Sequence, residues 1–180
     1  MSRHTARAVS NRLTEGVGGR RTEQKRDLGM LRPSKKLVLA LEAVTDIAFH
    51  GGSEPVQSQD IARRLNLPRR YLEQVMQQLV RAGILRGVRG PRGGYRLARE
   101  RRKVSVADVV RVVRGIEEPP TQGELGSSSE LGRRVVGPFW ARTEHDLMER
   151  LERVTIEDLC RRAEDEGVVS EARSDVDYAV

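Results

Sequence analysis

Hydrophobic residues recur at helical spacing from Ser34 to Phe49, which predicts a first helix over that segment. One stripe carries the side chains expected to be buried: Leu37, Leu41, Val44 and either Ile47 or Ala48. Ser34 is suited to cap the helix at its N-terminus, and Gly51 with Gly52 favours its end. A short extended piece is expected at Pro55–Val56.

Two further helices follow in the pattern. Ser58 is predicted to cap the second, in which Ile61, Ala62 and Leu65 form the buried face and Asn66 suits the end. Pro68 opens the third, a position where the fixed φ angle and the missing N–H of proline are tolerated. The third helix has two different faces. Its apolar stripe consists of Leu72, Val75, Met76 and Leu79, and its polar stripe of Arg70, Glu73, Gln74, Gln77 and Arg81.

Two short strands are predicted next, over Ile84–Val88 and Tyr95–Leu97. The segment Arg89–Gly94 between them contains one proline and several glycines, a composition that requires a tight turn. Its two arginines, Arg89 and Arg92, are expected to project from the tip. The pattern thus predicts a β-hairpin after three short helices.

The remaining sequence predicts three more helices. Capping boxes at Ser105–Asp108 and Thr155–Asp158 mark the start of two of them. Between these boxes, residues 117–137 are rich in Pro, Gly and Ser and are predicted to form a flexible loop. An amphipathic helix is predicted from Trp140 to Arg153. We expect its apolar face to mediate dimerisation, through Trp140, Leu147, Met148 and Leu151.

Charge changes this picture, because the basic residues are concentrated in one region. The chain of 180 residues carries 33 Lys and Arg against 26 Asp and Glu, a net charge of +7. Between Pro55 and Lys103, only Asp60, Glu73 and Glu100 oppose the basic residues, whereas acids dominate after Trp140. The first region is therefore expected to meet a polyanion.

Several classes of protein are not supported by the sequence. No apolar run approaches the roughly 20 residues that span a bilayer. The single cysteine, Cys160, excludes a disulfide or a multi-cysteine metal site within one chain. A phosphate-binding glycine loop and a Gly-x-Ser-x-Gly elbow are both absent from the sequence, so we do not expect an enzyme. The composition favours a cytoplasmic bacterial protein.

Short helices with a tight turn, a polar-faced third helix and an arginine-tipped hairpin together predict a winged helix-turn-helix. In this fold the third helix enters the major groove of double-stranded DNA. Gln can bind adenine, Arg guanine, and Glu the cytosine amino group. The predicted DNA-binding residues are Ser58, Arg69, Arg70, Tyr71, Glu73, Gln74, Gln77, Arg89, Arg92, Gly93, Gly94 and Tyr95.

The runs Tyr71–Gln74 and Val88–Leu97 resemble the signature of the Rrf2 family of bacterial transcriptional regulators. The resemblance covers about Leu31 to Ala163. It implies a homodimer with crossed C-terminal helices that binds a pseudo-palindromic operator, and we expect a repressor. It also implies that Glu73 reads bases, that Tyr71 and Gln74 flank it, and that Arg89 is the wing arginine. Many members have Ser at the position of Arg70, which implies a different base preference here.

The resemblance also implies a place for an iron–sulfur cluster, and here the sequence departs from the family. Cluster-binding members use three cysteines in the loop before the long helix, because iron requires thiolate ligands. The corresponding positions in this chain are about Gln122, Ser128 and Arg134, with a fourth near Gly137. We therefore expect no cluster and no other cofactor. Cluster-free members resemble a regulator that works with a cysteine synthase, which makes such an enzyme a candidate partner.

The predicted domain boundaries follow from these elements. Residues 1–29 are predicted to be a disordered basic tail, either an arm on DNA or a solvated leader, and Met30 could be the true start. The other divisions are a winged helix-turn-helix domain at 30–103, a linking helix at 104–116, the flexible loop at 117–137, dimerisation helices at 138–166 and a disordered tail at 167–180.

Two alternative functions remain open at this point. One is a winged-helix module that binds protein instead of DNA. The other is a thiol- or metal-responsive sensor. It would use Cys160, with Arg161 and Arg162 lowering the pKa of the thiol, or His145 with Asp146. The competing interpretations are a buried hydrophobic cysteine and a solvated histidine.

Overall fold

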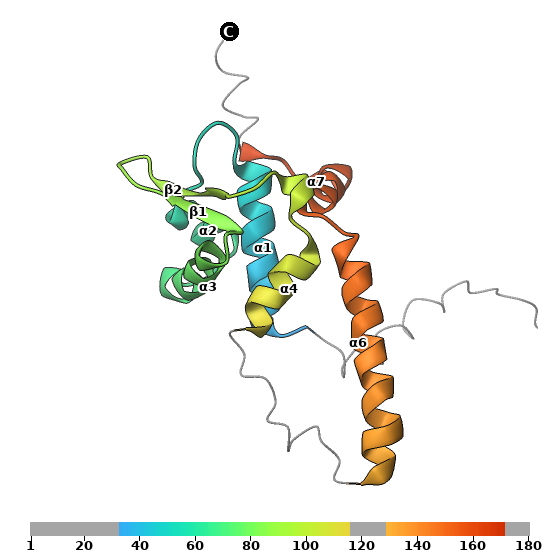
Figure 1. Cartoon of the computed structure of the whole chain (residues 1–180). Helices are drawn as coiled ribbons and strands as arrows, with labels where there is room; N and C mark the ends of the chain where they lie inside the picture. The colour runs from blue at the N-terminus through green and yellow to red at the C-terminus, as the bar shows by residue number, and fades with distance from the viewer. Residues whose placement is uncertain (1–32, 116–128, 172–180) are drawn as a thin grey trace, which may run out of the picture. The chain divides into compact units, whose positions relative to one another are not determined.

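Helix α1 (Lys35–His50) is the element against which most others pack in the computed structural model, which describes residues 33–115 and 129–171 (Figure 1). The Ser34 hydroxyl accepts a hydrogen bond from the Leu37 amide at 3.2 Å, which confirms the predicted cap. The buried residues are Leu39, Ala40, Ala43, Val44 and Ile47. The predicted buried stripe was therefore wrong in part, because Leu37 and Leu41 are only partly buried and pack against the edge of the core. Ala40 and Ala43, which contribute little to a hydrophobic pattern, are fully buried on the helix, and α3, α4 and α7 all pack against α1.

Helices α2 (Ser58–Arg64) and α3 (Arg69–Arg81) form the helix-turn-helix. Asn66 adopts a left-handed backbone, φ 51°, at the turn between them. The prediction that Ser58 caps α2 is wrong, because Gln57 is the cap residue and Ser58 the first helical residue. Gln57 takes this position because its carbonyl accepts the amides of Asp60 and Ile61. The predicted apolar stripe of α3 is confirmed: Leu72, Val75, Met76 and Leu79 are all buried.

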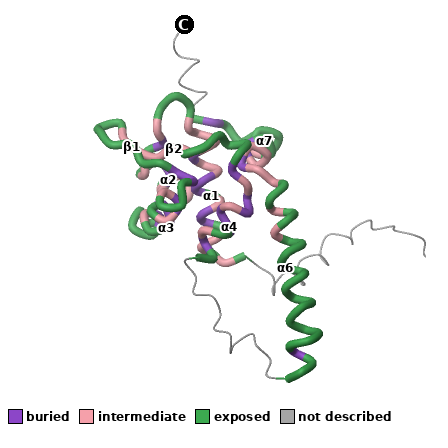
Figure 2. The backbone as a smooth tube through the Cα atoms, in the orientation of Figure 1, coloured by how far each residue is buried: buried purple, intermediate pink, exposed green. Residues whose placement is uncertain are grey.

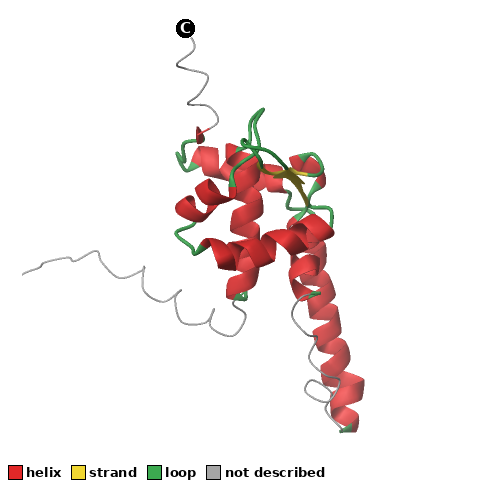
Figure 3. Ribbon diagram, turned by 90° about the vertical axis from the view of Figure 1, so that its left-hand side faces the viewer, coloured by secondary structure: helices red, strands yellow, loops and turns green. Residues whose placement is uncertain are grey.

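The hairpin consists of strands β1 (Leu85–Val88) and β2 (Gly94–Leu97), which form an antiparallel two-stranded sheet (Figure 3). A backbone bridge joins this hairpin to the extended residue Val56. The Val56 amide donates to the Tyr95 carbonyl at 3.0 Å, and the Tyr95 amide to the Val56 carbonyl at 2.8 Å. Since Val56 lies just before Gln57, the cap residue of α2, the bridge sets the position of the hairpin relative to the helix-turn-helix.

Both predicted capping boxes are present, and they lie against each other. Helix α4 (Val106–Arg114) follows a 3-10 turn, η1 (Arg101–Lys103), and α7 (Ile156–Asp165) follows Thr155. Ser105 and Thr155 form a backbone bridge. On either side of it, the Val106 amide donates to the Val154 carbonyl at 2.8 Å, and the Ile156 amide to the Val104 carbonyl at 2.9 Å. We call these two backbone segments, 104–106 and 154–156, the cap joint.

The cap joint brings α7 into the core of the winged helix. Ile156 and Cys160 are buried in the cluster that α1 and α3 also form. Figure 2 shows buried stretches of backbone along α1 and the elements that surround it. The sequence grouped residues 138–166 together as dimerisation helices, whereas the structure packs α7 against α1. The contact between two cap sequences so far apart in the chain was not visible in the sequence pattern.

Helix α6 (Gly137–Glu152) continues without a break from a π-helical segment, η2 (Gly132–Val136). The assignment of residues 130–137 to a flexible loop was therefore wrong. Gly132 and Gly137 belonged to the predicted loop, but both lie in a continuous helical segment, with a π-helical stretch directly before α6. No residue of α6 is buried in the described structure.

Some of the predicted features lie outside the described residues. They are the tail at 1–29, residues 117–128 of the loop with Gln122 and Ser128, and residues 172–180. Among the helices of residues 33–115 and 129–171, none has the length and apolar character needed to cross a membrane.

Candidate nucleic-acid interface

The exposed face of α3 carries the polar side chains predicted to read DNA. Burial of the apolar stripe on one side of α3 turns Arg70, Tyr71, Gln74 and Gln77 toward solvent. The Tyr71 residue is 45% exposed although tyrosine is largely apolar. This face therefore has both hydrogen-bonding groups and a free aromatic ring available to a ligand.

A groove of about 840 Å³ lies between α3 and the hairpin. Its lining brings together many of the predicted DNA-binding residues, namely Ser58, Arg69, Glu73, Gln77, Arg89, Gly93, Gly94 and Tyr95. Arg70, Tyr71, Gln74 and Arg92 do not line this groove. The predicted set is thus divided between the groove and the surfaces on either side of it.

Glu73 is held in place before any ligand arrives. The Arg69 Nε donates to the Glu73 carboxylate at 3.0 Å, one helical turn away. This exposed pair contributes little to stability, because solvent screens it. It does reduce the number of orientations open to the Glu73 side chain, so a contact from Glu73 to a base would need less ordering.

Gly93 and Gly94 have a packing role in the hairpin. A Cβ atom on Gly94 would lie 2.2 Å from the Val56 carbonyl oxygen, and one on Gly93 would lie 2.5 Å from that of Val88. Both distances are far below contact distance. These glycines therefore permit the close backbone approach that fixes the hairpin to Val56 and closes its turn.

Ser58 lacks the exposure that a direct phosphate contact would require. Its hydroxyl oxygen is buried, and no hydrogen-bond partner for it is present among the described residues. Ser58 stands at the first helical position instead of at the cap, and α2 has no side-chain hydrogen bond at its cap. A rotation of the side chain would be needed before Ser58 could bind a ligand in the groove.

The sequence prediction missed a pair of arginines on the other face of the hairpin. Arg86 and Arg96 lie directly opposite each other across β1 and β2. With Glu54, Arg89 and Arg92 they line a second cavity of about 700 Å³. Like charges directly opposite each other repel. The Arg96 guanidinium donates to the Ser53 carbonyl, and among the described residues neither arginine forms an ion pair with a carboxylate. Strand alternation combined with the hairpin register would have revealed the pair.

The structure does not favour a thiol sensor at Cys160. The residue is only 1% exposed, and burial raises the pKa of its thiol. Arg101 is the basic group that opposes this rise, whereas Arg161 and Arg162, which were expected to lower the pKa, are exposed. A buried thiol with a raised pKa has little of the thiolate form that reacts or binds metal.

The donor set does not fit an iron–sulfur cluster. Arg134 is exposed on the helical segment before α6, and Gly137 has no side chain. Within residues 33–115 and 129–171, no group of three or more His, Cys, Asp or Glu residues could hold a metal ion. His145 pairs with Glu149 at 3.4 Å on the surface of α6 instead of forming a ligand pair with Asp146.

A second candidate surface lies on α6 and η2. Trp140 is 53% exposed and Leu147 is 50% exposed, while Met148 and Leu151 are half-buried. Further exposed apolar residues precede them on the same helical segment: Leu131, Val135, Val136 and Phe139. Ion pairs from Arg111 to Glu152 and from Arg114 to Glu144 connect α6 to α4. So many exposed apolar side chains on one helix are typical of a protein interface.

Comparisons with known proteins agree with this geometry. A family model described as Rrf2, iron-dependent transcriptional regulator, matches residues 33–162. The transcriptional regulator IscR of Vibrio campbellii is 30% identical over 142 residues, which cover 78% of this chain and 83% of that protein. Protein rrf2 of Nitratidesulfovibrio vulgaris is 31% identical over 119 residues, which cover 66% and 79%.

Solved structures of two regulators have the same fold. The structure of CymR, the global cysteine regulator of B. subtilis, is similar with a TM-score of 0.61 and 31% identity, over 74% of this chain and 98% of that one. T. potens IscR is similar with a TM-score of 0.62 and 32% identity, over 81% and 97%.

Proposed function

The chain belongs to the Rrf2 family of DNA-binding transcriptional regulators, and we propose that it is a repressor that binds a pseudo-palindromic operator as a homodimer. The observation that carries this proposal is the groove between α3 and the hairpin, where polar and basic groups from both elements meet. An α-helix with its polar face outward fits the major groove, and a basic hairpin beside it can reach the phosphates.

In this mechanism α3 and the hairpin have different roles in binding DNA. Glu73, Gln74, Gln77 and Arg70 on α3 contact base edges and thereby set the sequence preference. Arg89 and Arg92 at the hairpin tip, together with Arg86 and Arg96 on its outer face, contact phosphates and hold the protein in position. A phosphate between Arg86 and Arg96 would also relieve their mutual repulsion.

We propose dimerisation through the apolar surface of α6 and η2. A second copy of the chain would bury Trp140 and Leu147, which the described chain leaves half exposed. The two-fold axis of such a dimer would place two α3 helices on two half-sites, in agreement with a pseudo-palindromic operator.

We propose that the regulator acts in the bacterial cytoplasm, without catalytic activity and without an iron–sulfur cluster. The misfit of Arg134, Gly137 and the buried Cys160 supports the absence of a cluster. DNA binding is then regulated by an effector molecule or a partner protein that changes the geometry of the dimer. The partner protein that the resemblance suggests is a cysteine synthase.

Fluorescence anisotropy over a salt series tests the proposal. One duplex carries the DNA upstream of the protein's own gene, and the other is a scrambled duplex of equal length. Preference for the native duplex by about a hundredfold or more would establish specific binding. Equal binding to both duplexes with a steep salt dependence would leave only the phosphate contacts. No binding at low salt would reject the DNA-binding proposal and favour a protein-interaction module.

Because phosphate contacts and base contacts come from different residues, substitutions of the two kinds of residue should have different effects on DNA binding. Arg89→Ala and Arg86→Ala should each weaken binding to native and scrambled DNA alike, and should reduce the salt slope by about one, because each removes a phosphate contact. Gln74→Ala should instead reduce discrimination among base pairs by roughly 1–3 kcal/mol while leaving the salt slope unchanged. Anisotropy with single-base variants of the operator measures both. Identical effects of the three substitutions on both duplexes would contradict this division.

A further inference from the structure

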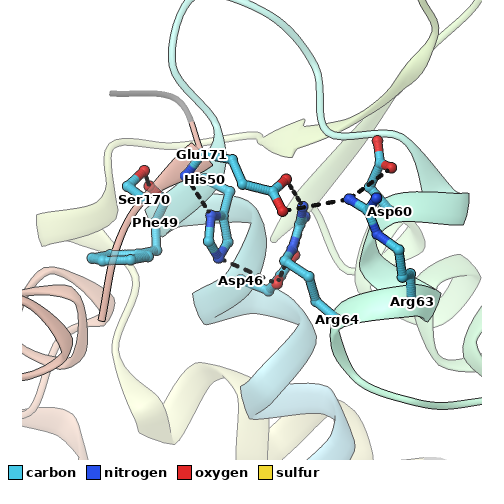
Figure 4. Close-up of polar contacts among 8 residues, drawn as sticks. All are labelled: Asp46, Phe49, His50, Asp60, Arg63, Arg64, Ser170 and Glu171. Carbon is cyan, nitrogen blue, oxygen red and sulfur yellow. Dashed lines mark hydrogen bonds and ion pairs between the residues drawn. The ribbon is translucent and has the colours of Figure 1, made fainter. Parts of the chain in front are cut away.

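The end of the described chain lies against the junction of α1 and α2 (Figure 4), and none of the residues that it contacts there lines the groove that we assign to DNA. Ser170 is buried, and its hydroxyl donates to the Phe49 carbonyl at 2.7 Å. The backbone N–H of the next residue, Glu171, donates to Nδ1 of His50 at 3.1 Å. Two consecutive residues thus bind the last turn of α1 through directional hydrogen bonds.

The Glu171 carboxylate also contacts α2, by way of two arginines. Arg64 forms a two-pronged pair with Asp46 of α1, with both N···O distances at 2.8 Å. Its remaining terminal nitrogen pairs with Glu171, and Arg63 pairs with the same carboxylate at 3.4 Å. The Arg64 side chain is only 15% exposed, so solvent screens these contacts less than it screens an ordinary surface pair. Arg64 therefore connects α1, α2 and the C-terminal segment.

The hydrogen bond at His50 exists in only one protonation state. Nδ1 accepts the Glu171 N–H, so the imidazole must be neutral and carry its proton on Nε2, which lies 3.7 Å from Asp46. A proton on Nδ1 would remove this acceptor and turn an N–H toward the Glu171 N–H. The bond is therefore incompatible with a charged imidazole.

The charges around His50 favour the neutral form. Burial lowers the pKa of His50 below its ordinary value of 6.5, Arg64 lowers it further, and Asp46 and Glu171 oppose both. Since the hydrogen bond to Nδ1 requires the neutral imidazole, the chain with the segment bound takes up fewer protons at His50 than the chain with the segment released as the pH falls below 6.5. Its binding is at full strength above that value and weakens as the pH falls from 6.5 toward the lowered pKa.

We propose that Ser170 and Glu171 form a latch that holds α2 against α1, and that protonation of His50 opens it. The docking surface consists of Asp46, the Phe49 carbonyl, His50 and Arg64, and its occupant is this chain's own C-terminal segment. Because α2 packs on both α1 and α3, an open latch leaves the helix-turn-helix less firmly held. A consequence for DNA binding rests on the proposed function, whereas the latch itself does not.

Hydrogen exchange of the Glu171 amide reports on the latch directly. In the full chain, the protection factor of this amide should fall by up to about tenfold for each pH unit below 6.5. In His50→Asn the protection should not depend on pH, because the asparagine carbonyl can accept the same N–H but cannot be protonated. Equal protection of the wild-type amide at pH values above and below 6.5 would overturn the proposal.

Two further variants test the contacts apart from the pH effect. Ser170→Ala should reduce Glu171 protection roughly tenfold, because it leaves the Phe49 carbonyl without this donor. Glu171→Gln should reduce it roughly threefold through the weakened pairing with Arg64. Glu166→Gln removes the same charge at the end of α7 and serves as the control with wild-type protection. Wild-type protection in both latch variants would overturn the proposal.

Binding to the native duplex at both pH values separates this proposal from the proposed function. If the latch supports α3, lowering the pH should weaken DNA binding more in the wild type than in His50→Asn. A chain that shows the predicted exchange behaviour but binds no DNA at either pH would retain the latch and reject the proposed function. pH-independent exchange in a chain that binds its operator specifically would reject the latch alone.

Discussion

Replacing Gly94 with alanine should reduce affinity for the native duplex by roughly 10- to 100-fold and should destabilise the fold by about 1–3 kcal/mol. The new methyl group would lie 2.2 Å from the Val56 carbonyl oxygen and 2.7 Å from its carbon. Both are backbone atoms, so rotation of a side chain cannot relieve the clash. The hairpin must move away from Val56, which breaks the bridge through the Tyr95 amide and displaces Arg89.

Gly87→Ala is the matched control, because it makes the same change on the opposite strand of the same hairpin. A Cβ atom on Gly87 meets nothing within 4 Å, so we expect nearly unchanged stability and Tyr95 amide protection. Gly87 also lines the groove, so the comparison of the two variants rests on thermal unfolding and hydrogen exchange of the Tyr95 amide and not on DNA affinity. If Gly94→Ala matched Gly87→Ala in both measurements, the close approach of the hairpin to Val56 would not be required.

Leu147→Asp should convert the proposed dimer into monomers and weaken binding to a two-half-site operator by roughly 10²- to 10⁴-fold. This is the gain that linking two binding modules typically provides. A carboxylate at this position would lose its hydration inside the apolar interface. The monomer should remain folded, since residue 147 is half exposed and α6 contributes no buried residue to the described core.

Arg142→Asp serves as the control for this prediction, because it introduces the same side chain on a different face of α6, where residue 142 is exposed. Sedimentation velocity gives the oligomeric state, and anisotropy with operators of one and two half-sites gives the affinities. Binding to one half-site should be nearly equal in both variants. A dimeric Leu147→Asp would show that the interface lies elsewhere on the chain.

The parts of the fold that depend on local interactions could be predicted from the sequence. Ser105 and Thr155 each bond to an aspartate three residues later, so a short motif is sufficient to locate both helix starts. The two stripes of α3 follow from helical periodicity, and the turn before Gly94 follows from its glycines. Most of the candidate groove could be predicted because it is built from these local elements.

The parts that could not be predicted depend on contacts between distant residues. Helix α7 joins the core through the bridge between Ser105 and Thr155, and neither residue carries a signal for the other. The same limit applies to the contacts of Glu171 with His50 and Arg64. The predicted loop before α6 failed for a different reason, because Gly132 and Gly137, residues typical of loops, lie in a continuous helical segment that contains a π turn.

The cap joint has a mechanical consequence for the choice of operator. It fastens the segment that follows α6 to the start of α4 by paired backbone hydrogen bonds, where a flexible linker would allow free rotation. Torque applied to α6 must therefore pass into the winged helix. One added base pair between half-sites turns them by about 35° relative to each other, from a helical repeat of roughly 10–10.5 base pairs per turn. A joint of this kind cannot absorb such a twist, so the regulator should distinguish operators by spacer length as strictly as by base sequence.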